Sequence, residues 1–272
     1  MVIHRVVGVV FSFGLLVGCG GSGGGRSPTA PSSSSQLTIN VTSDVIRCGK
    51  CESFTATLTR NGVTQNVTPT WRTDNTAIAT IDAAGQLTAI THGEVTVIAE
   101  HQGLSASKRV RIVADYEAAW HGNYLITRCD ARFDFEGFCD SDMFGPGQTL
   151  PIALELTQDR ERVSGTLWLG QLDGPFTGSV ATSGNLEGEA KFTYTAEEGS
   201  LDFLVSPFTV LREGDRISSG TFTVTMTSPG YRGNCTFDAR IMGLDKAPAA
   251  RTSAPMQQRL RTIRDVARLI RR

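Results

Sequence analysis

The sequence predicts an all-β protein, in which a small β-sandwich is followed by an antiparallel meander β-barrel and a short C-terminal amphipathic helix. Short runs of alternating apolar and polar residues recur between residues 37 and 245, and Gly-, Asn- and Asp-rich turns separate them. A helical period of apolar residues is found in the tail, residues 254–272. The chain has 272 residues, of which 40% are hydrophobic and 19% charged, which suffices for one large or two modest folded domains.

The N-terminus has the pattern of an export signal. A basic start precedes an apolar run over residues 6–17, about 12 residues long, whereas a membrane-spanning helix needs roughly 20. The run ends in Leu-Val-Gly-Cys at residues 16–19, which resembles the lipobox of bacterial lipoproteins. This resemblance implies that residues 1–18 are removed, that the Cys19 thiol is joined to diacylglycerol, and that the new N-terminus receives a fatty acyl chain such as palmitate.

Lipid attachment at Cys19 would make membrane lipid a partner and place the protein in the bacterial cell envelope. Several acyl chains give a stable anchor, because each buried methylene contributes about 0.8 kcal/mol and one chain alone is marginal. Gly20 follows the cysteine instead of the aspartate associated with inner-membrane retention, which favours the outer membrane. Residues 19–36 are rich in Gly, Ser and Pro, so we expect a tether.

Residues 37–113 predict a small antiparallel sandwich. About seven short alternating runs follow one another without a helical segment, and Asn61-Gly62 supplies a hairpin turn. Four spaced motifs together resemble the bacterial Ig-like domain, group 2: residues 71–75, 79–82, 85–89 and 93–99. The resemblance implies an exported spacer or adhesive module, in which Trp71 fills the middle of the sandwich and Gly85 and Gly93 make turns.

Residues 115–245 predict a second β-rich domain. The expected strands are 122–129, 150–158, 161–169, 174–181, 185–195, 201–211, 216–227 and 232–243. Hairpin-linked strands of this number suggest a barrel of about eight strands, with an open sandwich as the alternative. The segment Trp120–Tyr124 resembles the opening motif of lipocalin-like barrels. The expected interior residues are Leu154, Leu156, Val163, Leu167, Phe176, Val180, Phe192, Tyr194, Phe203, Val205, Phe222 and Val224.

The tail at residues 254–272 predicts a basic amphipathic helix. Its apolar residues recur at three- and four-residue spacing, and six arginines lie between Arg259 and Arg272 against one acid, Asp265. Three roles stay open: the apolar stripe covers the barrel, the helix lies on an anionic membrane surface, or it docks on a partner.

Export permits disulfides, and the chain has six cysteines. Lipid on Cys19 leaves an odd number, so at least one thiol has no partner within the chain. The five other cysteines are Cys48, Cys51, Cys129, Cys139 and Cys235. We expect one bridge within the first pair and one among the last three. A redox role for the first pair is less favoured, because reactive pairs of this spacing usually begin a helix.

No constellation of catalytic residues stands out. Asp140-Ser141-Asp142 has calcium-ligand spacing, but no further ligand completes the pattern, so a solvated loop is the better interpretation. We therefore expect no catalytic residues, no metal and no cofactor. The formal net charge of −1 gives no bulk attraction for nucleic acid.

These observations favour a non-catalytic, envelope-anchored lipoprotein whose Ig-like module presents a β-barrel-like binding domain. Its ligand would be a small apolar molecule, a protein or a glycan. The alternatives are an envelope hydrolase whose site is assembled across strands and a purely structural surface spacer. A small closed barrel holds a ligand inside only where its inward side chains leave space.

Overall fold

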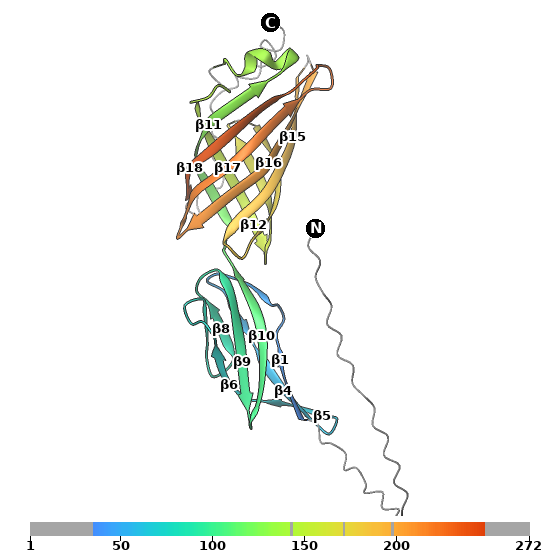
Figure 1. Ribbon diagram of the computed structural model, residues 1–272, viewed down its shortest axis with the longest axis vertical. Helices are drawn as coiled ribbons and strands as arrows, with labels where there is room; N and C mark the ends of the chain where they lie inside the picture. The colour runs from blue at the N-terminus through green and yellow to red at the C-terminus, as the bar shows by residue number, and fades with distance from the viewer. Residues whose placement is uncertain (1–34, 142–143, 171, 197–198, 248–272) are drawn as a thin grey trace, which may run out of the picture.

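The computed structural model describes residues 35–141, 144–170, 172–196 and 199–247 (Figure 1). It confirms the all-β fold class, with a sandwich region followed by a closed antiparallel barrel. The predicted signal peptide, the tether up to residue 34 and the predicted basic helix at 254–272 lie outside the described residues. Within the described part, no helix is long and apolar enough to cross a membrane.

The sandwich region contains three small sheets. They are ordered β1-β4-β5, β2-β10-β9-β6 and β3-β8-β7, and β2 pairs with β10 in parallel while the other pairs are antiparallel. The strands are β1 (Ser35–Asn40), β2 (Val45–Arg47), β3 (Cys51–Ser53), β4 (Thr55–Arg60), β5 (Val63–Val67), β6 (Thr70–Thr73), β7 (Ala79–Ile81), β8 (Gln86–Ala89), β9 (Gly93–His101) and β10 (Leu104–Val113).

Trp71 lies in the sandwich core, as the sequence predicts. It is 9% exposed, and Phe54 packs edge-on against it with ring centroids 6.4 Å apart. Gly85 turns the chain beside them with a φ of +84°. A side chain there would place its Cβ 2.3 Å from the Phe54 carbonyl oxygen and 3.1 Å from the Trp71 Nε1 atom. The turn therefore requires glycine, because it combines a left-handed backbone with a close approach to the core.

Eight sequential strands form the closed barrel, which settles the choice between a barrel and an open sandwich. Each strand pairs with the next along the chain, and the last pairs with the first. A 3₁₀ helix, η1 (Phe133–Phe138), follows the first strand. The strands are β11 (Ala118–Ala131), β12 (Thr149–Asp159), β13 (Arg162–Leu169), β14 (Leu172–Val180), β15 (Asn185–Ala196), β16 (Gly199–Glu213), β17 (Arg216–Thr227) and β18 (Cys235–Lys246).

Side chains fill the middle of the barrel as a packed core. Phe208 contacts both Phe176 and Phe222, with ring centroids 5.2 Å and 5.8 Å apart, and Tyr124 packs edge-on against Phe222 at 5.1 Å. All the predicted interior residues belong to this core or pack against it, although Phe192 and Tyr194 are only half-buried. An apolar ligand inside the barrel would have to displace these side chains.

The segment between the two domains packs into the end of the barrel that is nearer to the sandwich (Figure 1). Tyr116 is fully buried, and its hydroxyl donates to the Gly184 carbonyl at 2.8 Å and accepts the Arg212 N–H at 3.0 Å. Burial raises the pKa of Tyr116 to about 12, so the phenol stays neutral. The Trp120 indole N–H donates to the Tyr116 carbonyl at 2.9 Å.

Gln158 and Arg47 complete this junction. The Gln158 side chain accepts the Tyr116 N–H at 2.7 Å and donates to the Ala114 carbonyl at 3.0 Å. From the sandwich side, Arg47 donates to the Gln158 carbonyl at 3.0 Å and forms an ion pair with Glu117. The two domains are thus joined by a buried polar network, with η1 at the opposite end of the barrel (Figure 1).

Candidate functional site

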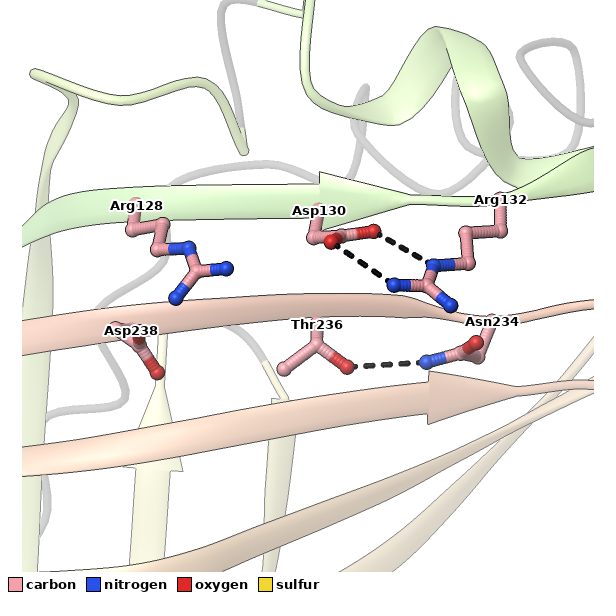
Figure 2. Close-up of a pocket in the computed structure, with 6 residues that line it drawn as sticks. All are labelled: Arg128, Asp130, Arg132, Asn234, Thr236 and Asp238. Atoms are coloured by element: carbon pink, nitrogen blue, oxygen red, sulfur yellow. Dashed lines mark hydrogen bonds and ion pairs between the residues drawn. The ribbon is translucent and has the colours of Figure 1, made fainter.

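A polar groove lies on the outer face of β11 and β18 (Figure 2). These strand segments are at the end of the barrel that carries η1 (Figure 1). The groove has a volume of about 360 Å³. Three of its lining residues come from the end of β11 and the residue after it, and three come from the start of β18 and the residue before it. They are Arg128, Asp130, Arg132, Asn234, Thr236 and Asp238.

Strand alternation and register place these residues on one face. Side chains two residues apart in a strand point to the same side of the sheet, so Arg128 and Asp130 share a face while Cys129 faces the core. In the ladder between the two strands, Arg128 is opposite Asp238 and Asp130 is opposite Thr236. The groove therefore exists only because the barrel closes between its first and last strands.

The carboxylates of the groove already have partners. Asp130 accepts hydrogen bonds from the Arg132 guanidinium at 3.1 Å and 3.4 Å, and these bonds, with the charge of Arg132, lower the pKa of the Asp130 carboxyl. Asp238 accepts the Thr223 hydroxyl at 2.8 Å. Both groups thus accept hydrogen bonds from neighbouring side chains, and the lowered pKa makes Asp130 a poor proton donor.

Arg128 is the unpaired cation of the groove. Among the described residues, no carboxylate lies within 4.0 Å of its guanidinium, although Asp238 is its neighbour in the ladder. The side chain is exposed and points along the groove toward Asp130 (Figure 2). Its donors are therefore available to an anionic or hydroxylated ligand.

Phe133 adds an exposed aromatic ring next to the groove residue Arg132. The ring is 64% exposed, and the residue has a φ of +57°, which is unusual for a bulky side chain. Gly233 permits this arrangement: a Cβ there would lie 2.2 Å from the Arg132 carbonyl oxygen and 3.0 Å from the Phe133 ring. Phe133 thus combines a strained backbone with an apolar side chain that is exposed to solvent.

Of the two expected bridges, the structure contains the one among the last three cysteines and lacks the one within the first pair. Cys19 lies outside the described residues, and Cys129 is joined to Cys139 by a disulfide with a Cα–Cα distance of 5.5 Å. The expected Cys48–Cys51 bridge is absent from the structure, in which both residues have free thiols. Cys48 packs against the sandwich core, whereas Cys51 is exposed at the start of β3.

The reason for the free thiols is the backbone between them. Gly49 turns the chain with a φ of +76° and donates its N–H to the Ala89 carbonyl at 2.9 Å, and the Ala89 N–H bonds the Lys50 carbonyl at 3.1 Å. These bonds fix the turn so that one cysteine faces inward and the other outward. The remaining free cysteine, Cys235, is buried in the barrel core.

The acidic loop after β11 has structural partners. Asp134 accepts the Arg232 N–H at 2.7 Å, and Asp130 pairs with Arg132 as described above. Of the proposed calcium-spaced pair, Asp140 is exposed and Asp142 lies outside the described residues. The sequence alone does not predict the groove as a site. In the sequence, the groove residues are recognisable only as polar residues at alternate positions near the ends of two strands, about 100 residues apart.

The fold defines a two-domain all-β protein with an external polar groove on its barrel. Residues 35–110 match the family model of the bacterial Ig-like domain (group 2), which covers the sandwich region. No curated protein matches the chain.

Three solved structures show similarity to the chain. A mutant intimin from EHEC O157:H7 is 19% identical with a TM-score of 0.23, over 37% of this chain and 52% of that one, so the chain spans about half of that structure. Domains 5–6 of the S-layer protein SbsC are 16% identical with a TM-score of 0.27, over 76% and 98% of the two chains. A protein of unknown function from the DUF3598 family of Nostoc punctiforme is 10% identical with a TM-score of 0.22, over 77% and 88%.

Proposed function

We propose that this protein is a non-catalytic lipoprotein of the bacterial cell envelope whose barrel domain binds an acidic glycan in the groove of β11 and β18. The unpaired Arg128 in that groove is the observation that carries the proposal. The Ig-like module acts as a spacer, and the junction at Tyr116 holds the barrel away from the membrane.

The groove is a better binding site than the barrel interior. The interior is occupied by aromatic and aliphatic side chains in mutual contact, including Phe176, Phe208 and Phe222. The groove is open to solvent and presents hydrogen-bonding groups along its length. Of the ligand classes that the sequence leaves open, a molecule bound at the surface is therefore favoured over a small apolar one inside.

A glycan fits the chemistry of the groove. Sugar hydroxyls pair with planar polar side chains, and here Asp130, Asp238 and Asn234 offer acceptors and donors. The apolar C–H face of a sugar ring packs on an exposed aromatic ring, which Phe133 supplies. A carboxylate on the sugar would satisfy Arg128. This combination favours a uronate-type glycan.

Binding should therefore depend on Arg128. On an array of acidic and neutral oligosaccharides, the protein should bind the acidic ones. Titration with oligogalacturonate then measures the affinity. Replacement by alanine (Arg128→Ala) should weaken binding roughly 10- to 100-fold, because a hydrogen bond to a charged group contributes about 1.5–3 kcal/mol. The matched control is Arg72→Ala, which removes an exposed arginine of the sandwich. The proposal is contradicted if the protein binds no acidic glycan on the array, or if the Arg128→Ala variant binds oligogalacturonate as tightly as the unmodified protein.

The anchor is tested separately from the groove. Metabolic labelling with radioactive palmitate should mark the expressed chain, and Cys19→Ala should abolish the label and move the protein from the membrane to the soluble fraction. Cys51→Ser, which removes an exposed thiol of the sandwich, should leave both unchanged. Label that persists in the Cys19 variant would remove the proposed attachment site.

The partners of the groove carboxylates support a non-catalytic role. A general acid needs a raised pKa, whereas the hydrogen bonds from Arg132 lower the pKa of Asp130. Hydrolysis of the bound oligogalacturonate by the purified protein would instead favour the envelope hydrolase. Failure of the whole array would favour the structural spacer.

A further inference from the structure

Three sulfur atoms meet where β11, η1 and β18 come together. Cys129 and Cys139 form the disulfide, and the free thiol of Cys235 lies with its Sγ 3.7 Å from the Sγ of Cys129. All three Sγ atoms lie within 4.8 Å of one another. A separation of 3.7 Å is close to van der Waals contact, so nothing stands between the free thiol and the disulfide.

The register of the barrel produces this arrangement. Ala131 is opposite Cys235 in the ladder between β11 and β18, so Cys129 is a diagonal neighbour of Cys235 on the inward face. The 3₁₀ helix then reverses the chain and returns Cys139 to the same place. Two cysteines ten residues apart and a third more than 100 residues away thereby share one side of the barrel end.

Three thiolates could hold a soft metal ion, but the disulfide removes two of them. The chemistry that the arrangement permits directly is thiol–disulfide exchange, in which a thiolate attacks one sulfur of a disulfide and displaces the other. We propose that Cys129 is the shared sulfur of two alternative disulfides, and that Cys235 can replace Cys139 as its partner.

The exchange needs no external oxidant or reductant. Cys235 loses its proton, and its sulfur forms a bond with the Cys129 sulfur while the bond between Cys129 and Cys139 breaks. Cys139 leaves with the bonding electron pair and takes up a proton. One disulfide and one thiol are present before and after the step.

The surroundings of Cys235 keep the starting linkage in place. Burial first, and then the negative charge of Asp130, raise the pKa of the Cys235 thiol to about 12. Only the thiolate attacks a disulfide, so Cys235 is almost inert at neutral pH while it remains buried. Opening of the barrel end would hydrate the thiol and allow the attack.

Exchange would release the segment that the disulfide now closes, residues 130–138. Its aromatic side chains Phe135 and Phe138 are fully buried, and they would remain in place only through packing and hydrogen bonds. Those bonds include the Arg132 N–H to the Asn234 carbonyl at 3.0 Å. Arg132 and Asn234 both line the groove, so the choice of disulfide would alter its edge. The inference is independent of what the groove binds.

Disulfide mapping of the full chain tests the proposal. The protein is incubated with a mixture of reduced and oxidised glutathione, quenched with acid, digested and examined by mass spectrometry. The untreated chain should yield the Cys129–Cys139 peptide, and the incubated chain should also yield a Cys129–Cys235 peptide that the untreated chain lacks. Cys51→Ser serves as the matched control and should give the same two peptides.

A second variant removes the competing partner. Cys139→Ser should pair Cys129 with Cys235 in the same buffer, with the loss of two hydrogen atoms in the intact mass and of two alkylatable thiols. Detection of the Cys129–Cys139 linkage alone in the incubated chain overturns the proposal, as does a folded Cys139→Ser variant in which Cys129 and Cys235 are both alkylated. The mapping of the unmodified chain decides the matter if the variant fails to fold.

Discussion

Replacement of Phe208 by alanine should lower the free energy of unfolding by about 3–5 kcal/mol, the range typical of a buried phenylalanine. The side chain is fully buried and contacts both Phe176 and Phe222. Its removal leaves a cavity in a core that the closed barrel cannot readily collapse, because hydrogen bonds between neighbouring strands fix the positions of those strands. Urea unfolding followed by the circular dichroism of the full chain measures the change.

Phe133→Ala is the matched control, because it truncates the same residue type at a position that is 64% exposed in the same domain. Its effect on stability should stay within about 0.5 kcal/mol. An equal loss of stability in both variants would contradict the packed interior and reopen the possibility of a ligand inside the barrel.

Removal of the Gln158 side chain should cost about 2–4 kcal/mol, because it leaves several buried backbone groups without a partner. The side chain is 8% exposed and bonds the Tyr116 N–H and the carbonyls of Ala114 and Arg160. Gln158→Ala should therefore loosen the junction, so that the sandwich and the barrel unfold in two transitions instead of one. Calorimetry of the full chain measures both effects.

Two further variants separate hydrogen bonding from packing at the junction. Gln158→Met keeps the approximate volume but makes no such hydrogen bonds, and it should be nearly as destabilising as alanine. Gln65→Ala replaces an exposed glutamine on β5 and should leave unfolding unchanged. A methionine variant as stable as the unmodified protein would show that the polar network does not hold the domains together.

Local patterns in the sequence determine much of the fold. Trp71 and Gly85 occur in motifs that resemble the bacterial Ig-like domain, the resemblance implies a core residue and a turn there, and the structure confirms both positions. Alternation along each barrel strand separates buried from exposed residues, which explains why the expected interior list agrees with the core. These features depend on residues that are close in sequence.

The groove and the sulfur cluster could not be predicted in the same way. Arg128 and Asp238 become neighbours only when the last strand pairs with the first, and the register of that pairing cannot be predicted from local sequence patterns. The cysteine pairing could not be predicted from short-range spacing either. Cys48 and Cys51 are close in sequence, but because of the turn at Gly49 their side chains point in opposite directions. Cys129 meets Cys235 across more than 100 residues.

A single strand, β11, connects the buried junction to the groove, although its pairing with β18 shifts register twice on the way. β11 begins two residues after Tyr116 and is 14 residues long, about 45 Å at roughly 3.3 Å per residue, and its last four residues include Arg128 and Asp130. A pull on a bound ligand would therefore pass along this strand as tension and reach the sandwich through the peptide backbone that joins β11 to β10, beside the hydrogen bond and ion pair of Arg47. The hydrogen bonds that pair β11 with β12 and with β18 would all be loaded in shear by a force along the strand, so the barrel would resist that force. The end of the barrel that carries η1 could still rearrange.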